Sequence, residues 1–275
     1  MRYLIASDID RTLIKNSKSD ISNDTKNIVG KLRSNNNVFI IASGRPLNNI
    51  KRLFKEYCDY IIGSNGAIIY DCKNDNIIYK DHIDKNRISD IVKTVGNNYK
   101  KICFCSEEGW NIKVNYKYQL RYIEERFIDN LNISFEVLKI EIYYDNIKHL
   151  NQVYNKLKKY NDLDVFRIIK GEDIGGYIEV INHGNDKYNA IKILLEKENI
   201  SNDYLITFGD NNNDLLMIKN AKYGVAVEDA SDEVLKVSRY TTKSCKEDGV
   251  FYFLNNNFDL EKNEIMVSSQ SKNTR

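Results

Sequence analysis

The chain has 275 residues, of which 42% are hydrophobic, enough for one large domain or two ordinary domains with buried cores. Its 41 Lys and Arg against 39 Asp and Glu give a formal net charge of +2, which favours neither nucleic acid nor a membrane surface as a partner. No apolar run approaches the ~20 residues of a membrane helix, and no signal peptide is seen at the N-terminus. We therefore expect a cytoplasmic protein with no nucleic-acid partner and no membrane partner.

The five cysteines are odd in number and scattered along the chain. They contain no Cys-x-x-Cys pair, and the chain has only 3 histidines, so a zinc site is not expected. The pattern favours buried, reduced thiols, which fits a cytosolic protein.

The first part of the chain alternates short apolar runs with helical patterns. An apolar run over residues 3–6 predicts a buried strand. A helix is expected over 22–34, with Ser22 or Asn23 as its N-cap. The further expected elements are a strand at 38–42, a helix at 47–57, a strand at 60–62 and a hairpin of 67–70 with 77–79. This order predicts a parallel sheet with right-handed crossovers.

The pattern changes between residues 84 and 181. Here the expected elements are helices near 86–99, 116–127 and 147–160, and strands near 101–106, 110–114, 139–144, 165–169 and 177–181. The parallel pattern then resumes with a helix at 187–198, a strand at 204–208, a helix at 215–219 and a strand at 223–227. We therefore predict an α/β fold, a Rossmann-like doubly wound parallel sheet core with an inserted α+β domain.

The predicted domain limits follow from this interruption. The core is expected to be discontinuous, formed by residues 1–83 and 182–261, and the insertion covers 84–181. The polar C-terminal stretch, 262–275, is expected to be a flexible tail.

Two carboxylates, Asp8 and Asp10, follow the first predicted strand. Side chains two residues apart on a strand share a face, and two close carboxylates resist ionising unless a cation lies between them. The pair therefore suggests Mg2+ or a carboxylic acid kept protonated for proton transfer. Taken alone, it is better explained by a solvated turn, because Asp is common in loops.

Short polar groups also follow two other predicted strands: Ser43 and Gly44 after one, and Asp210, Asn213 and Asp214 after the other. In an open α/β sheet, ligands bind outside the carboxyl ends of the strands, so these groups are expected to converge on one site. Lys187, at the start of the helix after the insertion, can approach the same place. In isolation, Ser43 is equally explained as a helix N-cap. A surface lysine is the common case at the start of a helix, but the position of Lys187 after the insertion favours the functional interpretation.

The set resembles the motifs of the haloacid dehalogenase superfamily. The matching residues are Asp8-Ile-Asp10-Arg-Thr12, Ser43-Gly44-Arg45, Lys187 and Gly209-Asp210-x-x-Asn213-Asp214. Their order and spacing are similar to those of its phosphatases, and the insertion resembles the IIB cap of Cof-type hydrolases. Two further stretches fit, Ser64-Asn65-Gly66-Ala67 and Glu247-Asp248-Gly249-Val250. The resemblance covers residues 1–255.

The resemblance implies a Mg2+-dependent phosphatase that acts on a small phosphorylated metabolite, such as a sugar phosphate or a phosphorylated cofactor. It implies that Asp8 is the nucleophile and forms an aspartyl phosphate. Asp10 is implied as the acid that protonates the leaving oxygen and then as the base that activates water. Lys187 is implied as the partner of Asp8 and of the phosphate.

The remaining implied roles concern the metal and the phosphoryl group. The implied metal ligands are Asp8, Asp10 through its backbone carbonyl, and Asp210, with Asp214 supporting the metal or the phosphate from the edge. The implied phosphate contacts are Ser43, the Gly44 amide, Lys187 and Asn213. Gly44 lets the backbone approach the phosphoryl group closely.

Other functions remain open at this stage. A phosphomutase of the same superfamily would return the phosphoryl group to substrate, and nothing in the sequence decides against it. A phospho-acceptor signalling module uses a similar set of residues, but the Asp8-x-Asp10 spacing and the long insertion argue against it. A non-catalytic binding protein would normally have lost one of the acidic or lysine motif residues, and all are present.

Overall fold

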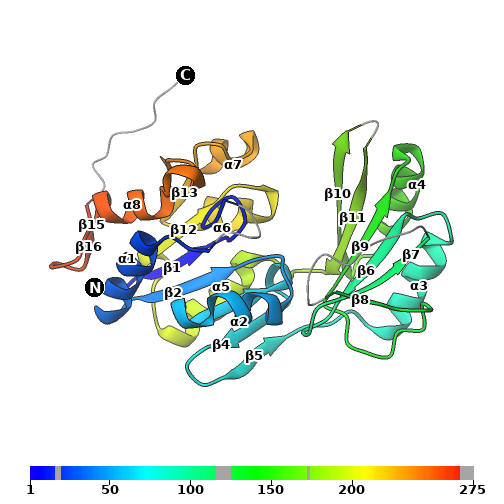
Figure 1. Cartoon of the computed structure of the whole chain (residues 1–275), viewed down its shortest axis with the longest axis horizontal. Coiled ribbons are helices and arrows are strands. Elements are labelled where there is room, and N and C mark those ends of the chain that lie inside the picture. Colours follow the sequence, from blue (N-terminus) through cyan, green and yellow to red (C-terminus); the bar gives the residue numbers. More distant parts are fainter. Residues whose placement is uncertain (16–19, 116–124, 172–173, 267–275) are drawn as a thin grey trace. The chain divides into compact units, whose positions relative to one another are not determined.

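The computed structural model describes residues 1–15, 20–115, 125–171 and 174–266 (Figure 1). The chain divides into two compact units. The first unit comprises Met1–Gly44, Lys51–Ile78 and Asp186–Arg275, and the second comprises Arg45–Ile50 and Tyr79–Asn185. Within the described ranges, no helix is both long enough and apolar enough to cross a membrane.

The first unit is built on an eight-stranded sheet with the order β14-β13-β12-β1-β2-β3-β4-β5. Its strands are β1 (Leu4–Ser7), β2 (Val38–Ala42), β3 (Tyr60–Gly63), β4 (Ile68–Asp71), β5 (Asn76–Lys80), β12 (Leu205–Gly209), β13 (Tyr223–Val227) and β14 (Tyr240–Thr242). Neighbouring strands from β14 to β3 are parallel, and β3 pairs with β4 antiparallel. The parallel sheet predicted from the sequence is confirmed.

Strand β1 lies at the centre of this sheet. Its Leu4 is paired with Val38 of β2 on one side and with Leu205 of β12 on the other. Every residue of β1, β2 and β12 is buried. Strands covered on both faces are nearly continuous apolar runs, which is why these three stretches were recognisable in the sequence.

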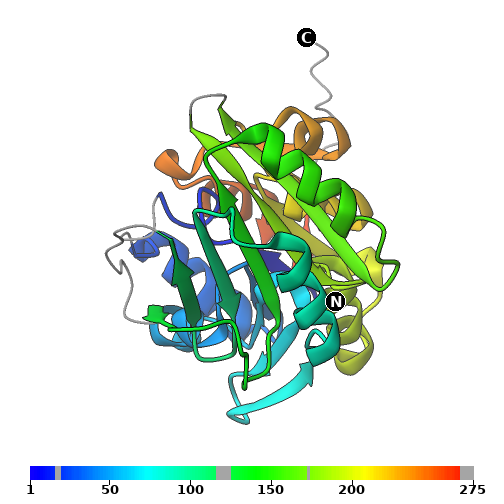
Figure 2. The ribbon, with the colours of Figure 1, turned by 90° about the vertical axis from the view of Figure 1, so that its right-hand side faces the viewer.

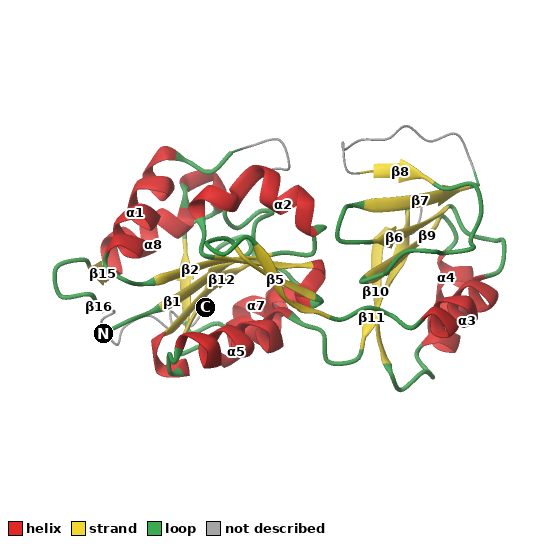
Figure 3. Ribbon diagram, turned by 90° about the horizontal axis from the view of Figure 1, so that it is seen from below, coloured by secondary structure: helices red, strands yellow, loops and turns green. Residues whose placement is uncertain are grey.

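Helices cover both faces of the sheet, as the red ribbons on either side of the yellow strands show in Figure 3. They are α1 (Asn23–Ser34), α2 (Leu47–Phe54), α5 (Lys187–Glu198), α6 (Leu215–Asn220), α7 (Asp232–Val237) and α8 (Gly249–Asn257). In α1, Ser22 is the N-cap and accepts a hydrogen bond from the Thr25 amide. The buried residues Ile28, Val29 and Leu32 form one apolar face of α1. This arrangement is the doubly wound α/β fold.

The second unit contains a six-stranded sheet with the order β10-β11-β9-β6-β7-β8. Its elements are α3 (Lys85–Val95), β6 (Lys101–Cys105), β7 (Trp110–Val114), β8 (Glu125–Phe127), β9 (Lys139–Tyr144), α4 (Ile147–Leu157), β10 (Leu163–Gly171) and β11 (Gly175–Asn182). Figure 2 shows α3 and α4, in teal and green, in front of the strands of this sheet. The apolar core of the unit includes Ile91 of α3, Leu150 of α4, and Ile140 and Ile142 of β9. The α+β character of the segment follows from this layering.

Hydrogen bonds join the two segments through which the chain enters and leaves the second unit. The Tyr79 hydroxyl donates to Asn185 Oδ1 at 3.3 Å, and Asn185 Nδ2 donates to Asp81 Oδ2 at 2.9 Å. Asn182 Nδ2 also donates to Asp81 Oδ1 at 3.0 Å. The outgoing and returning segments therefore lie side by side.

The structure differs from the sequence-based prediction near residue 125. The predicted helix over 116–127 is wrong for residues 125–127, which form β8 and pair in parallel with β7. Residues 116–124 of that prediction lie outside the described residues. An amphipathic pattern in so short a segment does not distinguish a helix from an edge strand, because the partner strand is the deciding factor.

The C-terminal region also differs from the prediction. Residues 264–265 of the expected tail form β16 (Glu264–Ile265), which pairs antiparallel with β15 (Phe258–Asp259). Residues 267–275 lie outside the described part of the chain. Helices α7 and α8 and strand β14 were not predicted. A six-residue helix such as α7 spans fewer than two turns and shows little periodicity.

Candidate active site

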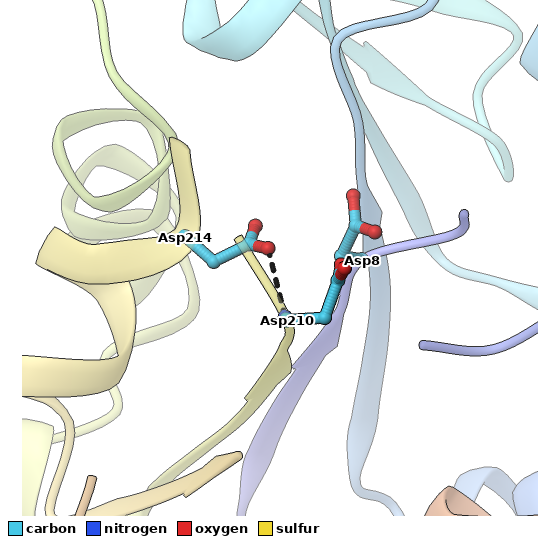
Figure 4. A group of neighbouring side chains, drawn as sticks. All are labelled: Asp8, Asp210 and Asp214. Carbon is cyan, nitrogen blue, oxygen red and sulfur yellow. Dashed lines mark hydrogen bonds between the residues drawn. The ribbon is translucent and has the colours of Figure 1, made fainter. Parts of the chain in front are cut away.

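Three buried carboxylates meet at the carboxyl ends of two adjacent strands of the first unit. Asp8 directly follows β1, Asp210 directly follows β12, and Asp214 ends the 3-10 turn Asn212–Asp214. One ligand atom from each lies within 4.8 Å of the others (Figure 4). The pairing of β1 with β12 fixes this approach, because the Asp8 amide donates to the Phe208 carbonyl at 3.0 Å. Residues about 200 positions apart are thus brought together by strand order.

Lys187 is the cation of this cluster. It is the first residue of α5, whose N-cap is Asp186, and it is almost completely buried. Its Nζ atom lies 2.6 Å from Asp8 Oδ1 and 2.6 Å from Asp214 Oδ1. Lys187 is therefore not a surface lysine. One ammonium group faces three carboxylates, so the set carries excess negative charge when all three are ionised.

The environment opposes that ionisation. Burial raises the pKa of the Asp8 carboxyl well above its ordinary value against the opposing effect of Lys187, and the nearby Asp214 and Asp210 raise it further. The pKa of Asp210 is raised to about 6, mainly by burial and secondarily by the neighbouring Asp214 carboxylate. Burial lowers the pKa of Lys187, but the carboxylates of Asp214 and Asp8 outweigh this, so that it lies above its ordinary value. A hard cation bound by these oxygens would favour their ionised forms.

The turn that follows β1 carries the second motif aspartate. The amides of Leu13 and Ile14 both donate to the Ile9 carbonyl at 2.9 Å, and Arg11 has a left-handed backbone with φ 64°. Asp10 is half-buried on this turn and does not belong to the group of three clustered carboxylates. The side chain of Asp10 thus occupies a different environment from that of Asp8.

Two residues of the same turn contact Asp210. The Thr12 hydroxyl donates to Asp210 Oδ1 at 3.3 Å, and an Arg11 guanidinium nitrogen lies 3.6 Å from Asp210 Oδ2. Thr12 is buried, whereas Arg11 is largely exposed. Thr12 therefore connects the β1 turn to the β12 turn. In the sequence, only the position of Thr12 within the motif indicates that it belongs to the site, because Thr12 and Asp210 are 198 positions apart.

Asp214 holds the loop after β12 in place. Its Oδ2 atom accepts hydrogen bonds from the amides of Asp210 and Asn211, each at 3.1 Å, and its Oδ1 atom accepts from Lys187. Figure 4 marks the bond to the Asp210 amide with a dashed line. A Cβ atom on Gly209 would lie 2.5 Å from Asp214 Cβ, so the close packing requires glycine there. Both oxygens of Asp214 are thus engaged within the protein.

Asn65 links the remaining motif residues. Its backbone amide donates to the Ser43 backbone carbonyl at 3.0 Å, and its side-chain Oδ1 atom accepts from Asn213 Nδ2 at 3.1 Å. A Cβ atom on Gly44 would lie 2.9 Å from the same Oδ1. Ser43 is buried, and Asn213 is exposed. The contact between Asn65 and Asn213 joins residues that are 148 positions apart, so no local pattern in the sequence indicates that Asn65 belongs to the site.

The stretch near residue 248 has a structural role. Asp248, with a left-handed backbone at φ 58°, accepts hydrogen bonds from the hydroxyls of Ser22 and Thr25, the latter at 2.7 Å. These bonds attach the start of α1 to the start of α8. Asp248 therefore stabilises helix packing in the first unit.

The first unit is thus a doubly wound α/β domain with a cluster of three carboxylates and one lysine at the carboxyl ends of its strands. The family model described as haloacid dehalogenase-like hydrolase matches residues 5–254. The chain therefore belongs to the haloacid dehalogenase-like hydrolase family.

Individual relatives resemble nearly the whole chain. The 5-amino-6-(5-phospho-D-ribitylamino)uracil phosphatase YitU of Bacillus subtilis is 26% identical over 274 residues, covering 94% of this chain and 98% of the relative. A haloacid dehalogenase-like hydrolase from Bacteroides thetaiotaomicron has a TM-score of 0.78 at 25% identity, covering 94% of this chain and 100% of that one. The HAD subclass IIB sugar phosphatase BT4131 shares the fold, with a TM-score of 0.74 at 20% identity and coverage of 92% and 98%.

Proposed function

We propose that this protein is a Mg2+-dependent phosphatase that hydrolyses a small phosphorylated metabolite through an aspartyl-phosphate intermediate. The observation that carries the proposal is the buried Asp8–Lys187–Asp214 arrangement beside Asp210, at the carboxyl ends of β1 and β12. Membership of a hydrolase family and the phosphatase relative from Bacillus subtilis support it.

The donor set fits a hard divalent cation. The cluster offers carboxylate oxygens only, which Mg2+ prefers, and its negative charge exceeds the charge of Lys187. Asp8 and Asp210, with the backbone carbonyl of Asp10, are the proposed ligands. When bound, the cation neutralises charge on the phosphoryl oxygens. Asp214, whose oxygens are engaged by Lys187 and by loop amides, is proposed to support these ligands from behind.

Asp8 is the proposed nucleophile. A carboxylate oxygen of Asp8 forms a bond to phosphorus while the bond from phosphorus to the ester oxygen breaks. The Lys187 ammonium nitrogen lies 2.6 Å from an Asp8 carboxylate oxygen. This contact orients the carboxylate, and the positive charge offsets the repulsion between the carboxylate and the phosphate. In this environment the nucleophile is fixed before substrate arrives.

Asp10 is the proposed acid and base. It donates its proton to the departing ester oxygen and then takes a proton from the water that attacks the aspartyl phosphate. Its position outside the three-carboxylate cluster supports a role different from that of Asp8.

The phosphoryl group has four proposed contacts, which are Ser43, the Gly44 amide, Lys187 and Asn213. Asn65 connects Ser43 to Asn213 and so holds two of these contacts in register. Because Gly44 has no side chain, a phosphoryl oxygen can approach its amide. The substrate class is a small phosphorylated compound, in keeping with the phosphoribitylamino compound named for the Bacillus subtilis relative.

The test is turnover of a generic aryl phosphate and of a panel of sugar and cofactor phosphates, with and without Mg2+. We expect phosphate release that requires Mg2+ and is lost in Asp8→Asn. Stable phosphorylation of Asp8 without hydrolysis of any compound would overturn the proposal. Transfer of the phosphoryl group to a second hydroxyl of the substrate, without phosphate release, would identify a mutase instead.

A further inference from the structure

Two cysteines that flank one hairpin of the first unit lie in contact. The Sγ atoms of Cys58 and Cys72 are 3.7 Å apart. Cys58 lies two residues before β3, and Cys72 directly follows β4. This separation corresponds to van der Waals contact, and a bond requires the sulfur atoms to approach to ~2.05 Å.

The strand pair holds the two cysteines in this position. Strands β3 and β4 pair antiparallel with Tyr60 opposite Asp71, and the Cys72 amide donates to the Asp59 carbonyl at 2.9 Å. The backbone next to each sulfur is therefore fixed by sheet hydrogen bonds. The contact between the thiols is a consequence of the register of the hairpin and not of a mobile loop.

The two thiols differ in access to solvent. Cys58 is buried, whereas Cys72 is partly exposed. The pKa of the Cys58 thiol is raised well above its ordinary value, mainly by burial and secondarily by the hydrogen bond with Cys72. An oxidant in solution therefore meets Cys72 first, and Cys58 can act only as the second, internal thiol.

We propose that Cys58 and Cys72 form a reversible intrachain disulfide, with Cys72 as the thiol that reacts with a small external disulfide and Cys58 as the resolving thiol. The Cys72 thiolate attacks one sulfur of glutathione disulfide, forms a mixed disulfide and releases one glutathione thiolate. The Cys58 thiol then loses its proton, attacks the Cys72 sulfur and releases the second glutathione. The protein loses two hydrogen atoms, and one glutathione disulfide becomes two glutathione thiols.

The cross-link would close a ring around a functional segment. The chain between the two cysteines includes Ser64, Asn65 and Gly66, which all have positive φ angles. Asn65 of this segment bonds to Asn213 and to the Ser43 carbonyl. Oxidation would thus restrain, in both the folded and the unfolded chain, the hairpin that presents Asn65. The proposal does not depend on the phosphatase activity.

The experiment counts thiols in the folded, full-length protein after treatment with glutathione disulfide. We expect two of the five free thiols to disappear and proteolytic peptides containing Cys58 and Cys72 to be joined. Dithiothreitol should restore both thiols, and the rate should increase with pH because Cys58 must lose its proton. Retention of all five thiols, or a glutathione adduct on Cys72 that never transfers to Cys58, would overturn the proposal.

Variants separate the two roles. Cys58→Ala should accumulate a stable glutathione adduct on Cys72, and Cys72→Ser should keep its remaining thiols under the same conditions. Cys103→Ser, which removes another buried thiol, is the matched control and should still form the Cys58–Cys72 bond. Equal loss of thiols in Cys72→Ser and in the parent chain would contradict the assignment. The measurement on the parent chain needs no variant, so a folding defect in one of them leaves the test intact.

Discussion

The Lys187 ammonium nitrogen lies 2.6 Å from an Asp8 carboxylate oxygen, and it lies equally close to Asp214. The lysine comes from the first turn of α5 and the nucleophile candidate from the end of β1, so the contact unites two elements that are separated by the whole second unit in sequence. All three side chains are buried, which makes each of them costly to leave without its partner.

Replacement of Lys187 by methionine should therefore lower both stability and activity. The change leaves Asp8 and Asp214 buried without their cation, and we expect a loss of about 3–5 kcal/mol in the free energy of unfolding. Urea denaturation measures this. Lys192→Met, an exposed position on the same helix, is the control and should change stability by less than ~0.5 kcal/mol. Equal stability of the two variants would argue against the buried cluster.

Replacement of Asp10 by asparagine should slow turnover without removing the metal site. If Asp10 transfers protons in both steps, loss of the carboxyl should lower kcat by roughly 10²- to 10⁴-fold. Stabilisation by Mg2+ should be retained, because the proposed contact of Asp10 with the metal is made by its backbone carbonyl. Full activity in this variant would refute the acid and base assignment.

Removal of divalent cations should lower the melting temperature of the protein. Binding to the folded state alone stabilises it by about 2.7 kcal/mol when Mg2+ is present at 100 times its dissociation constant. Differential scanning fluorimetry with EDTA and with increasing Mg2+ tests this. The increase should be abolished in Asp210→Asn and preserved in Glu233→Gln, an exposed position of α7. An unchanged Mg2+ response in Asp210→Asn would exclude Asp210 as a ligand.

Glycine is required at position 66, and this can be tested by comparison with position 30. Gly66 has a φ of 108°, and a Cβ atom there would lie 2.3 Å from the Asp186 carbonyl oxygen. We expect Gly66→Ala to destabilise the protein by more than ~1 kcal/mol. Gly30 lies within α1 with no atom within 4 Å of a Cβ, so Gly30→Ala should stabilise by about 1 kcal/mol. Thermal denaturation should show shifts of opposite sign, and shifts of the same sign would contradict this reasoning.

The second unit contains a buried ion cluster that can be tested in the same way. Lys139 Nζ lies 2.9 Å from Glu141 Oε1 and 2.9 Å from Glu179 Oε2, and it is almost completely buried. Lys139→Met should destabilise the protein by about 3–5 kcal/mol because the buried Glu179 and the largely buried Glu141 lose their cation.

The triple variant Lys139→Met, Glu141→Gln, Glu179→Gln provides the control for this cluster. It removes the charges together and should recover much of the lost stability. Urea denaturation of both variants distinguishes the loss of charge pairing from the loss of packing. If the triple variant is no more stable than the single variant, packing of the lysine stem is the main contribution.

The sequence allowed the central sheet and the convergence of the site to be predicted, since both depend on local patterns. Buried parallel strands are continuous apolar runs, and the polar residues that end them must meet at one edge. Asp8, Asp210 and Asp214 were placed together on this basis, and the structure brings their carboxylates together. Their chemical roles remain proposals.

Contacts between distant residues were beyond such reasoning. The bond of Thr12 to Asp210 and the bond of Asn65 to Asn213 depend on how separate loops pack, and no local periodicity encodes them. The same holds for β8, which is a strand because β7 offers it a partner edge. Short elements such as α7 bury too few residues for their pattern to stand out.

The hydrogen bonds among Tyr79, Asp81 and Asn185 have a consequence for how this chain can change. These bonds join the segment that leaves the sheet of the first unit to the segment that returns to it. The distance between the two ends of the insertion therefore does not depend on the residues between them. The hydrogen bonds between the two segments offset part of the entropic cost of closing so long an insertion. Recombination could therefore exchange the intervening stretch as a cassette while the sheet of the first unit stays unchanged.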